Sequence, residues 1–250
     1  MATFVAQRHN VDVGQVRLTL RPLRGGLQAM AVAHVAAQFV DRQGRRGAET
    51  LVVKRLDGEA RREAAIYRSV LRTSGATQRA AVPRLLGIDS ASPDRPEHSE
   101  SCYLYLEAIR RATAWPWDEP ARAALVLEQL AALHESLPPR ALGDAGVAWN
   151  YEAALLDSAR TTVLLFDTFG PDRLPTGGRA VRPALRRVVE ALPAMRRAVL
   201  AVEPFGEVVV HGDAHPGNVL LRRRGAAEQA VLLDWGRARL GSPLEDVSSW

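Results

Sequence analysis

Cysteine, lysine and long apolar runs are all scarce in this sequence. Cys102 is the single cysteine, so an internal disulfide is excluded and a small core residue is the expected role. No apolar run approaches the roughly 20 residues that a membrane-spanning helix needs, so no membrane association is expected. Residues 1–13 contain no apolar core of a signal peptide. A cytoplasmic location is therefore the default prediction.

The composition is otherwise typical of a soluble globular protein. The chain has 250 residues, 47% of them hydrophobic and 24% charged, which suffices for one large domain or two small ones. The formal net charge of +5 comes from arginines scattered along the chain in pairs, without a compact basic stripe or interleaved aromatic residues. Nucleic-acid binding is therefore not expected.

Short strands and polar turns follow one another near the C-terminal end. Val208–Val210 is a β-branched run that stops at His211, and further strands are predicted over 219–221 and 230–233. Two strands joined by a tight polar turn predict a hairpin. This arrangement brings three polar side chains together at one end of a sheet: Asp213, Asn218 and Asp234.

These three side chains suit phosphoryl transfer. A carboxylate can orient an attacking hydroxyl and accept its proton, while Mg²⁺ takes oxygen ligands from one or two carboxylates and keeps several waters. The spacing His-x-Asp-x-x-x-x-Asn from His211 to Asn218 matches the kinase catalytic loop, with Gly212 where protein kinases have arginine. Residues 234–236, Asp-Trp-Gly, match the metal-binding Asp-Phe-Gly motif.

The two motifs in this order, HGDAHPGN and then LLDWG, closely resemble the aminoglycoside phosphotransferase family of small-molecule kinases, which includes choline-kinase-like enzymes. The resemblance implies transfer of the γ-phosphate of ATP to a hydroxyl of a small molecule. It implies Asp213 as the catalytic base and Asn218 and Asp234 as Mg²⁺ ligands. His211 and Asp246 would support the catalytic loop, the latter from a segment that also resembles the family.

Lys54 is the one lysine among the 33 basic residues, and it lies in a strand predicted over 49–56. Its compact ammonium can touch phosphate oxygens as a point charge, which the planar fork of arginine does not reproduce. The helix predicted over 58–71 carries Glu59 and Glu63 on one face. By themselves both glutamates fit solvent-facing partners of arginines. The resemblance favours Glu63 as the partner that orients Lys54 toward the α- and β-phosphates.

The first 107 residues predict a sheet accompanied by that one helix. Five strands are predicted, and a turn at Gly25-Gly26 joins the first two; the ranges are 16–20, 30–39, 49–56, 82–87 and 103–108. This unit matches a kinase N-lobe. The end of the fifth strand would then be the hinge, whose backbone around Leu106, Glu107 and Ala108 would hold the adenine, although a plain core strand fits the residues equally well.

The remainder of the chain is predicted to be mainly helical around the hairpin. Helices are predicted over 121–137, 151–169 and 182–202, the last one broken or kinked at Pro193, and His134 in the first is expected to be structural. The prediction for the fold class is α+β.

More specifically, the sequence and the resemblance predict a protein-kinase-like bilobal fold. An antiparallel-sheet N-lobe would span 1–107 and a mainly helical C-lobe would span 108–250. More helices follow in the family, so the C-terminal helices are expected to be missing here. The sequence would then be either a fragment or a protein with a reduced acceptor site.

Two other functions remain open at this point. His211, Asp213 and His215 alternate and could bind the zinc or iron ion of a metallohydrolase, although the other histidines form no ligand-like cluster. The chain could also be a non-catalytic nucleotide-binding protein of kinase-like fold. The acceptor, the choice between ATP and GTP, and the oligomeric state are not predicted.

Overall fold

The computed structural model describes residues 1–23, 31–73, 75, 81–109, 112–114, 119–142, 151–168, 178–202 and 206–248. The predicted turn at Gly25-Gly26 lies outside these residues.

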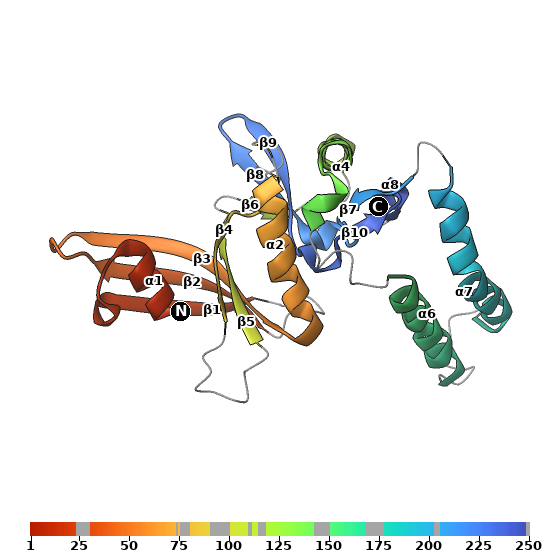
Figure 1. The fold of residues 1–250 in the computed structure, drawn as a ribbon, viewed down its shortest axis with the longest axis horizontal. Coiled ribbons are helices and arrows are strands. Elements are labelled where there is room, and N and C mark those ends of the chain that lie inside the picture. Colours follow the sequence, from red (N-terminus) through yellow and green to blue (C-terminus); the bar gives the residue numbers. More distant parts are fainter. Residues whose placement is uncertain are drawn as a thin grey trace.

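A five-stranded antiparallel sheet forms the N-terminal part of the molecule (Figure 1). Its spatial order is β1-β2-β3-β5-β4. The bounds are β1 Val16–Leu23, β2 Ala31–Val40, β3 Arg46–Asp57, β4 Leu85–Ser90 and β5 Ser101–Glu107. All five predicted strands are present. The third strand, predicted over 49–56, begins earlier than expected, because β3 pairs with β2 from Arg46 opposite Val40 onward.

The two faces of this sheet are covered by different helices. Along β3, Leu51 and Val53 belong to the apolar cluster that includes Val5 of α1 (Ala2–His9). The ring of Phe4 stacks on that of Tyr105, with 3.8 Å between centroids. The sequence did not predict α1, because its eight residues carry only a weak apolar stripe and its burial depends on the sheet.

The opposite face of the sheet packs against α2 (Arg62–Thr73), which follows the short 3₁₀ turn η2 (Gly58–Arg61). Because side chains alternate along a strand, Lys54 and Leu56 share this face. Leu56 joins the main core, which continues through α2 into the C-terminal part of the chain. Figure 1 shows α2 between the sheet and the later strands.

Three long helices follow the sheet: α4 Pro120–Ser136, α6 Tyr151–Thr168 and α7 Gly178–Leu200. Pro120 occupies the start of α4, where its missing N–H costs no hydrogen bond. The last helix was predicted to be broken or kinked at Pro193. It is not broken there, since α7 continues through Pro183 and Pro193. α6 and α7 pack against each other at the end of the molecule away from the sheet (Figure 1), and Arg197 Nη1 lies 2.6 Å from Glu152 Oε1.

The predicted hairpin is β8 (Val219–Arg224) with β9 (Ala227–Leu232). β7 (Val208–Val210) does not join it but pairs with β10 (Arg239–Gly241). β6 (Ala112–Ala114), which the sequence did not predict, adds to the edge of β8. The β7–β10 and β6–β8 pairings were not predicted from the sequence. Each joins a three-residue strand to a distant partner, and runs that short have no detectable periodicity.

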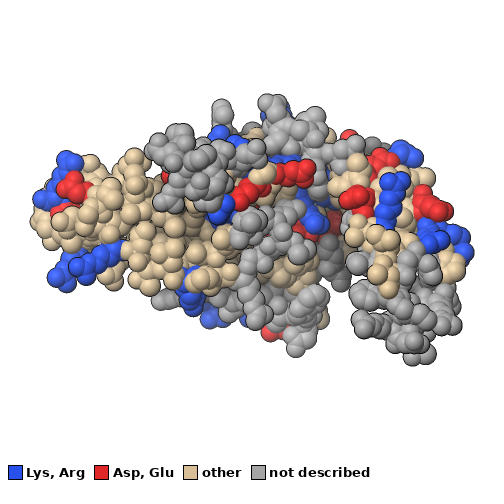
Figure 2. Space-filling model, turned by 90° about the horizontal axis from the view of Figure 1, so that it is seen from below, with Lys and Arg blue, Asp and Glu red and all other residues tan. Residues whose placement is uncertain are grey.

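The short elements η4 (Pro139–Leu142), η6 (Pro216–Asn218), η7 (Trp235–Arg237) and α8 (Pro243–Val247) complete the C-terminal part, and η1 (Val13–Gln15) precedes the sheet. On the face shown in Figure 2, basic and acidic side chains of the described residues lie near one another at both ends of the molecule and near its middle. Within the described ranges, no helix combines the length and apolar character needed to cross a membrane.

Candidate active site

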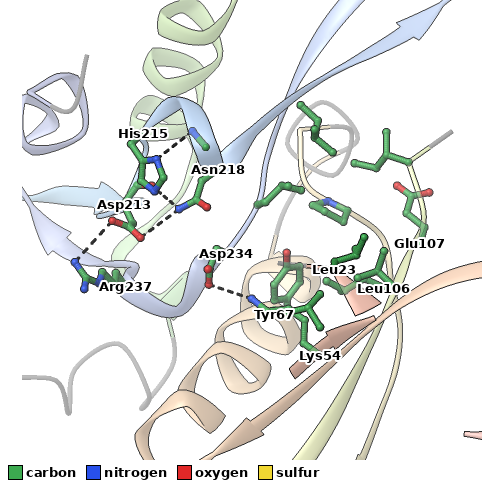
Figure 3. Close-up of a pocket in the computed structure, with 17 residues that line it drawn as sticks. Leu23, Lys54, Tyr67, Leu106, Glu107, Asp213, His215, Asn218, Asp234 and Arg237 are labelled. Atoms are coloured by element: carbon green, nitrogen blue, oxygen red, sulfur yellow. Dashed lines mark hydrogen bonds and ion pairs between the residues drawn. The ribbon is translucent and has the colours of Figure 1, made fainter. Parts of the chain in front are cut away.

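A cavity of about 650 Å³ lies between the sheet and the β8–β9 hairpin (Figure 3). Leu106 and Glu107 line one side, and Asp213 and Asn218 line the other. The remaining lining residues are Leu23, Val32, Val52, Lys54, Tyr67, Pro83, Ile109, His215, Gly217, Leu220, Leu233, Asp234 and Arg237. The cavity therefore has apolar walls and a few convergent charged groups, which is typical of a small-molecule site.

Lys54 joins the sheet, α2 and the segment after β9 at the floor of this cavity. Its Nζ donates to both carboxylate oxygens of Glu63, at 2.7 and 2.6 Å, and to Asp234 Oδ1 at 3.0 Å. Glu63 is buried, whereas the alternative partner Glu59 is exposed. The pairing of Lys54 with Glu63, and not with Glu59, is thus present in the structure.

Burial dominates the electrostatics of Glu63. It raises the pKa of this carboxyl from 4.5 to about 7, although the positive charge of Lys54 acts in the opposite direction. The negative charge of Asp234 raises the same pKa further. The charges of Lys54, Glu63 and Asp234 are therefore coupled in a largely buried setting. A cation that bound Asp234 would change the electrostatic interactions among all three.

Arg62 anchors the segment that carries Asp234. From the start of α2, its guanidinium donates to the backbone carbonyl of Gly236 at 2.5 Å and to that of Ala238. Burial and the nearby Arg239 lower the pKa of Arg62 to about 10, which leaves it charged at neutral pH. Asp234 itself has φ of 61°, in the left-handed region. The helix that supplies Glu63 thus also holds the backbone that presents Asp234.

Asp213 and Asn218 lie at the two ends of the loop between β7 and β8. Asn218 Nδ2 donates to the backbone carbonyl of Asp213 at 3.0 Å and to Asp213 Oδ2 at 3.2 Å. This orientation directs the amide oxygen of Asn218 away from Asp213, where a cation could use it. The carbonyl of Asn218 accepts from Leu233 N at 2.8 Å, which ties the loop to the strand that precedes Asp234.

The carboxylate of Asp246 binds the backbone at the start of this loop. Its Oδ2 accepts from His211 N at 2.8 Å and from His134 Nε2 at 2.9 Å, and its Oδ1 accepts from Gly212 N at 2.7 Å. Burial alone would raise the pKa of Asp246, but the His134 hydrogen bond, the nearby His211 and the two backbone donors outweigh it and hold the pKa below its usual range. His134 contributes to the network as a partly buried structural residue.

Gly212 has φ of +78°, and a Cβ at this position would lie 1.9 Å from Arg239 Nη1 and 2.3 Å from the carbonyl oxygen of Arg237. The guanidinium of Arg239 occupies this space because it donates to the carbonyls of Gly212 and Arg237. Arg239 also pairs with Glu245 and lies 3.4 Å over the ring of Tyr151. A glycine therefore stands where protein kinases have arginine because a different arginine packs against the loop.

The metallohydrolase alternative is not favoured by this geometry. His211 is buried, its Nε2 donates to Leu233 O at 2.8 Å, and its Nδ1 accepts from Asp213 N at 3.3 Å. Burial lowers the pKa of His211, against the opposing effect of Asp246. His215 Nδ1 accepts from Gly217 N at 3.0 Å. Among the residues that the structure describes, no three His, Cys, Asp or Glu side chains form a metal-binding group.

The predicted hinge is divided between two cavities. Leu106 and Glu107 line the large cavity, whereas Ala108 lines a smaller neighbouring cavity of about 370 Å³ together with Glu107. Glu107 N donates to Arg84 O at 2.9 Å, so this backbone donor is already used.

Three site residues were not recognised from the sequence. These residues are Arg62, Tyr67 and Arg237. Arg237 Nη1 lies 3.7 Å from Asp213 Oδ1 and faces the loop in Figure 3. The spacing of Glu63 and Tyr67, one helical turn apart, was the available signal for Tyr67. No local signal existed for Arg62, because its partners lie 174 and 176 residues away.

The model of the phosphotransferase enzyme family matches residues 19–249 of the chain. Among solved structures, spectinomycin phosphotransferase in complex with ADP and spectinomycin is similar over 92% of this chain and 67% of its own, with a TM-score of 0.56 and 14% identity. An aminoglycoside phosphotransferase from Alicyclobacillus acidocaldarius subsp. acidocaldarius DSM 446 is similar over 94% and 68%, with a TM-score of 0.50 and 18% identity.

No curated protein matches the chain significantly. At these identities the structural likeness concerns the fold, and it confirms the predicted α+β, protein-kinase-like class.

Proposed function

The chain belongs to the phosphotransferase enzyme family, and from this premise we propose that it transfers the γ-phosphate of ATP to a hydroxyl group of a small molecule. One observation carries the proposal. Lys54 Nζ bridges Glu63 and Asp234 within 3.0 Å in the same cavity that Asp213 and Asn218 line. In the proposed function these groups would position a nucleoside triphosphate, a metal ion and an attacking hydroxyl.

Asp213 is the proposed catalytic base. Its carboxylate lies on the cavity wall and is held by Asn218 Nδ2 at 3.2 Å. It would orient the acceptor hydroxyl and take its proton as the oxygen attacks phosphorus. The guanidinium of Arg237, whose Nη1 lies 3.7 Å from Asp213 Oδ1, would help to hold this carboxylate in place.

Asp234 and Asn218 are the proposed ligands of Mg²⁺. A carboxylate and an amide oxygen are hard oxygen donors that suit this cation, which takes few protein ligands and binds phosphate oxygens as well. When bound, the metal would neutralise charge on the transferring phosphoryl group. Lys54 would then contact the α- and β-phosphates, with Glu63 orienting its ammonium.

The nucleotide base is proposed to lie toward the other end of the cavity. Leu106 and Glu107 line that end, and the backbone around Leu106 to Ala108 would hold the adenine. Glu107 N already donates to Arg84 O. We therefore expect the backbone N–H that donates to the adenine to belong to Ala108 or a later residue. In this proposal residues 1–107 act as the nucleotide-binding lobe and residues 108–250 as the catalytic lobe.

The acceptor is proposed only as a class, a small molecule with a hydroxyl group. Support comes from the family and from the similar solved structure of spectinomycin phosphotransferase, which is in complex with ADP and spectinomycin. A panel of hydroxyl-bearing small molecules, aminoglycosides included, is therefore the appropriate screen, with ATP and GTP as alternative donors.

Calorimetric titration of ATP into the purified protein, with and without Mg²⁺, tests the proposal. We expect Mg²⁺-dependent binding that Asp234→Ala removes, and transfer to an acceptor that Asp213→Ala removes while nucleotide binding remains. Asp12→Ala, a change at an exposed position before the sheet, is the control and should alter neither. Absence of nucleotide binding by the wild-type protein would overturn the proposal. Binding without transfer to any acceptor of the panel would favour a non-catalytic nucleotide-binding protein.

A further inference from the structure

Tyr67 has a buried hydroxyl with no hydrogen-bond partner among the described residues. The side chain is 1% exposed, yet it contributes to the lining of the large cavity. A buried polar group that lacks a partner is costly, and native proteins contain few of them. An unpaired hydroxyl at the wall of a binding cavity therefore suggests that its partner is a ligand atom.

The surroundings of Tyr67 place this hydroxyl at the phosphate end of the cavity. Tyr67 lies one helical turn after Glu63 on α2, on the same face of the helix. Figure 3 shows its ring beside Lys54 and Asp234, the two groups proposed for the phosphates and the metal. The carboxylates of Glu63 and Asp234 are both close enough to act on its ionisation.

The Tyr67 hydroxyl has the character of a donor. Burial, and secondarily the charges of Glu63 and Asp234, raise the pKa of Tyr67 well above its ordinary value, so the group stays protonated at neutral pH. In the structure it is shielded from water while Lys54 Nζ and Asp234 Oδ1 are in contact at 3.0 Å. A metal–nucleotide held by Asp234 and Lys54 would bring oxygen acceptors to this end of the cavity.

We propose that Tyr67 is a further ligand-binding residue, whose hydroxyl donates a hydrogen bond to an oxygen of the bound metal–nucleotide. The oxygen belongs either to a phosphate or to a water held by the metal. This inference rests on the proposed function, because it requires a nucleotide in the cavity.

A second buried hydroxyl supplies the matched control. Tyr105 also has no partner for its hydroxyl among the described residues, but it belongs to the cluster on the other face of the sheet, where its ring stacks on Phe4. Tyr105 does not line the large cavity. Replacement of either tyrosine by phenylalanine removes one buried, unpaired hydroxyl and keeps the ring.

The experiment compares the wild-type protein with Tyr67→Phe and Tyr105→Phe by thermal unfolding and by calorimetric titration of ATP. Without ligand, both variants should melt at the same temperature as the wild type or slightly higher, because each loses an unsatisfied group. With Mg²⁺ and ATP, Tyr67→Phe should bind about tenfold more weakly and show a smaller ligand-induced rise in melting temperature, as expected for the loss of one hydrogen bond to a charged group. Tyr105→Phe should bind as the wild type does.

Titrations without Mg²⁺, at ATP concentrations high enough to measure the weaker metal-free binding, distinguish the two sources of the oxygen. A loss of affinity of equal size with and without the metal would assign the partner to a phosphate, and a loss seen with Mg²⁺ alone would assign it to a metal-held water. Wild-type binding that Tyr67→Phe leaves unchanged would overturn the inference and leave the proposed function intact. Failure of the wild-type protein itself to bind ATP would instead refute the proposed function on which the inference rests.

Discussion

Lys54 and Glu63 form a buried pair in which one ammonium lies 2.7 and 2.6 Å from the two oxygens of one carboxylate. The side chains are 9% and 2% exposed, and the same ammonium reaches Asp234 at 3.0 Å. Neither charge has extensive contact with water, so each depends on the other. Removal of one partner should therefore have a larger effect than removal of both.

Above pH 7, where Glu63 is ionised, Lys54→Met is expected to destabilise the fold by about 3 kcal/mol, because it leaves the Glu63 carboxylate buried without its counter-charge. It should also lower turnover at least a hundredfold if Lys54 positions the phosphates. The double variant Lys54→Met/Glu63→Gln should recover most of the stability and none of the activity. Urea unfolding and steady-state kinetics provide the two measurements. Recovery of activity in the double variant would contradict the assigned role of Lys54.

The raised pKa of Glu63, about 7 in place of 4.5, predicts a definite pH dependence of stability. Between these two values the unfolded chain has lost the proton and the folded protein retains it, so the free energy of unfolding falls as the pH rises. The total fall in the free energy of unfolding is roughly 3 kcal/mol, and it is complete above pH 7. Glu63→Gln lacks this titration, and its stability should therefore improve relative to the wild type from pH 4.5 to pH 7.5. Urea midpoints at several pH values test this, and a relative change in the opposite direction would show that Lys54 outweighs burial.

Asp246→Asn is expected to destabilise the protein by about 2–4 kcal/mol, because the amide has one acceptor oxygen where the carboxylate accepts three hydrogen bonds. The loss should be largest near neutral pH. Since the pKa of Asp246 is lowered, its stabilising effect is present above pH 3.8 and disappears as the pH falls through the lower, folded value. Chemical unfolding of both proteins at pH 7 and at acidic pH gives the comparison. A pH-independent difference would mean that the charge of Asp246 has no part in the network.

Gly212→Ala and Gly44→Ala form a matched pair, because both glycines have φ of +78°. A Cβ on Gly44 meets nothing within 4 Å, so that change should cost about 1 kcal/mol of backbone strain. A Cβ on Gly212 meets Arg239 and the Arg237 carbonyl at impossible distances, so Gly212→Ala should cost at least about 2 kcal/mol more. It should also displace Asp213 and reduce turnover, whereas Gly44→Ala should leave turnover unchanged. Equal stability losses would refute the packing argument.

Local sequence patterns determined a large part of this protein. Alternating apolar residues and turns predicted all five strands of the first sheet, and the helical pattern after Lys54 predicted the helix that carries Glu63. The spacing of His211, Asp213 and Asn218, with the later Asp234, predicted the family that the comparisons show. These features could be read because each depends on residues close together in the chain.

The tertiary structure decided what depends on distant partners. It selected Glu63 over Glu59, since only the buried glutamate reaches a lysine held by β3. It also paired β7 with β10, covered the sheet with α1 and joined Arg62 to backbone carbonyls more than 170 residues away. The unpaired hydroxyl of Tyr67 is of the same kind. Whether a buried polar atom has a hydrogen-bond partner depends on every chain segment packed around it, and sequence periodicity does not predict those contacts.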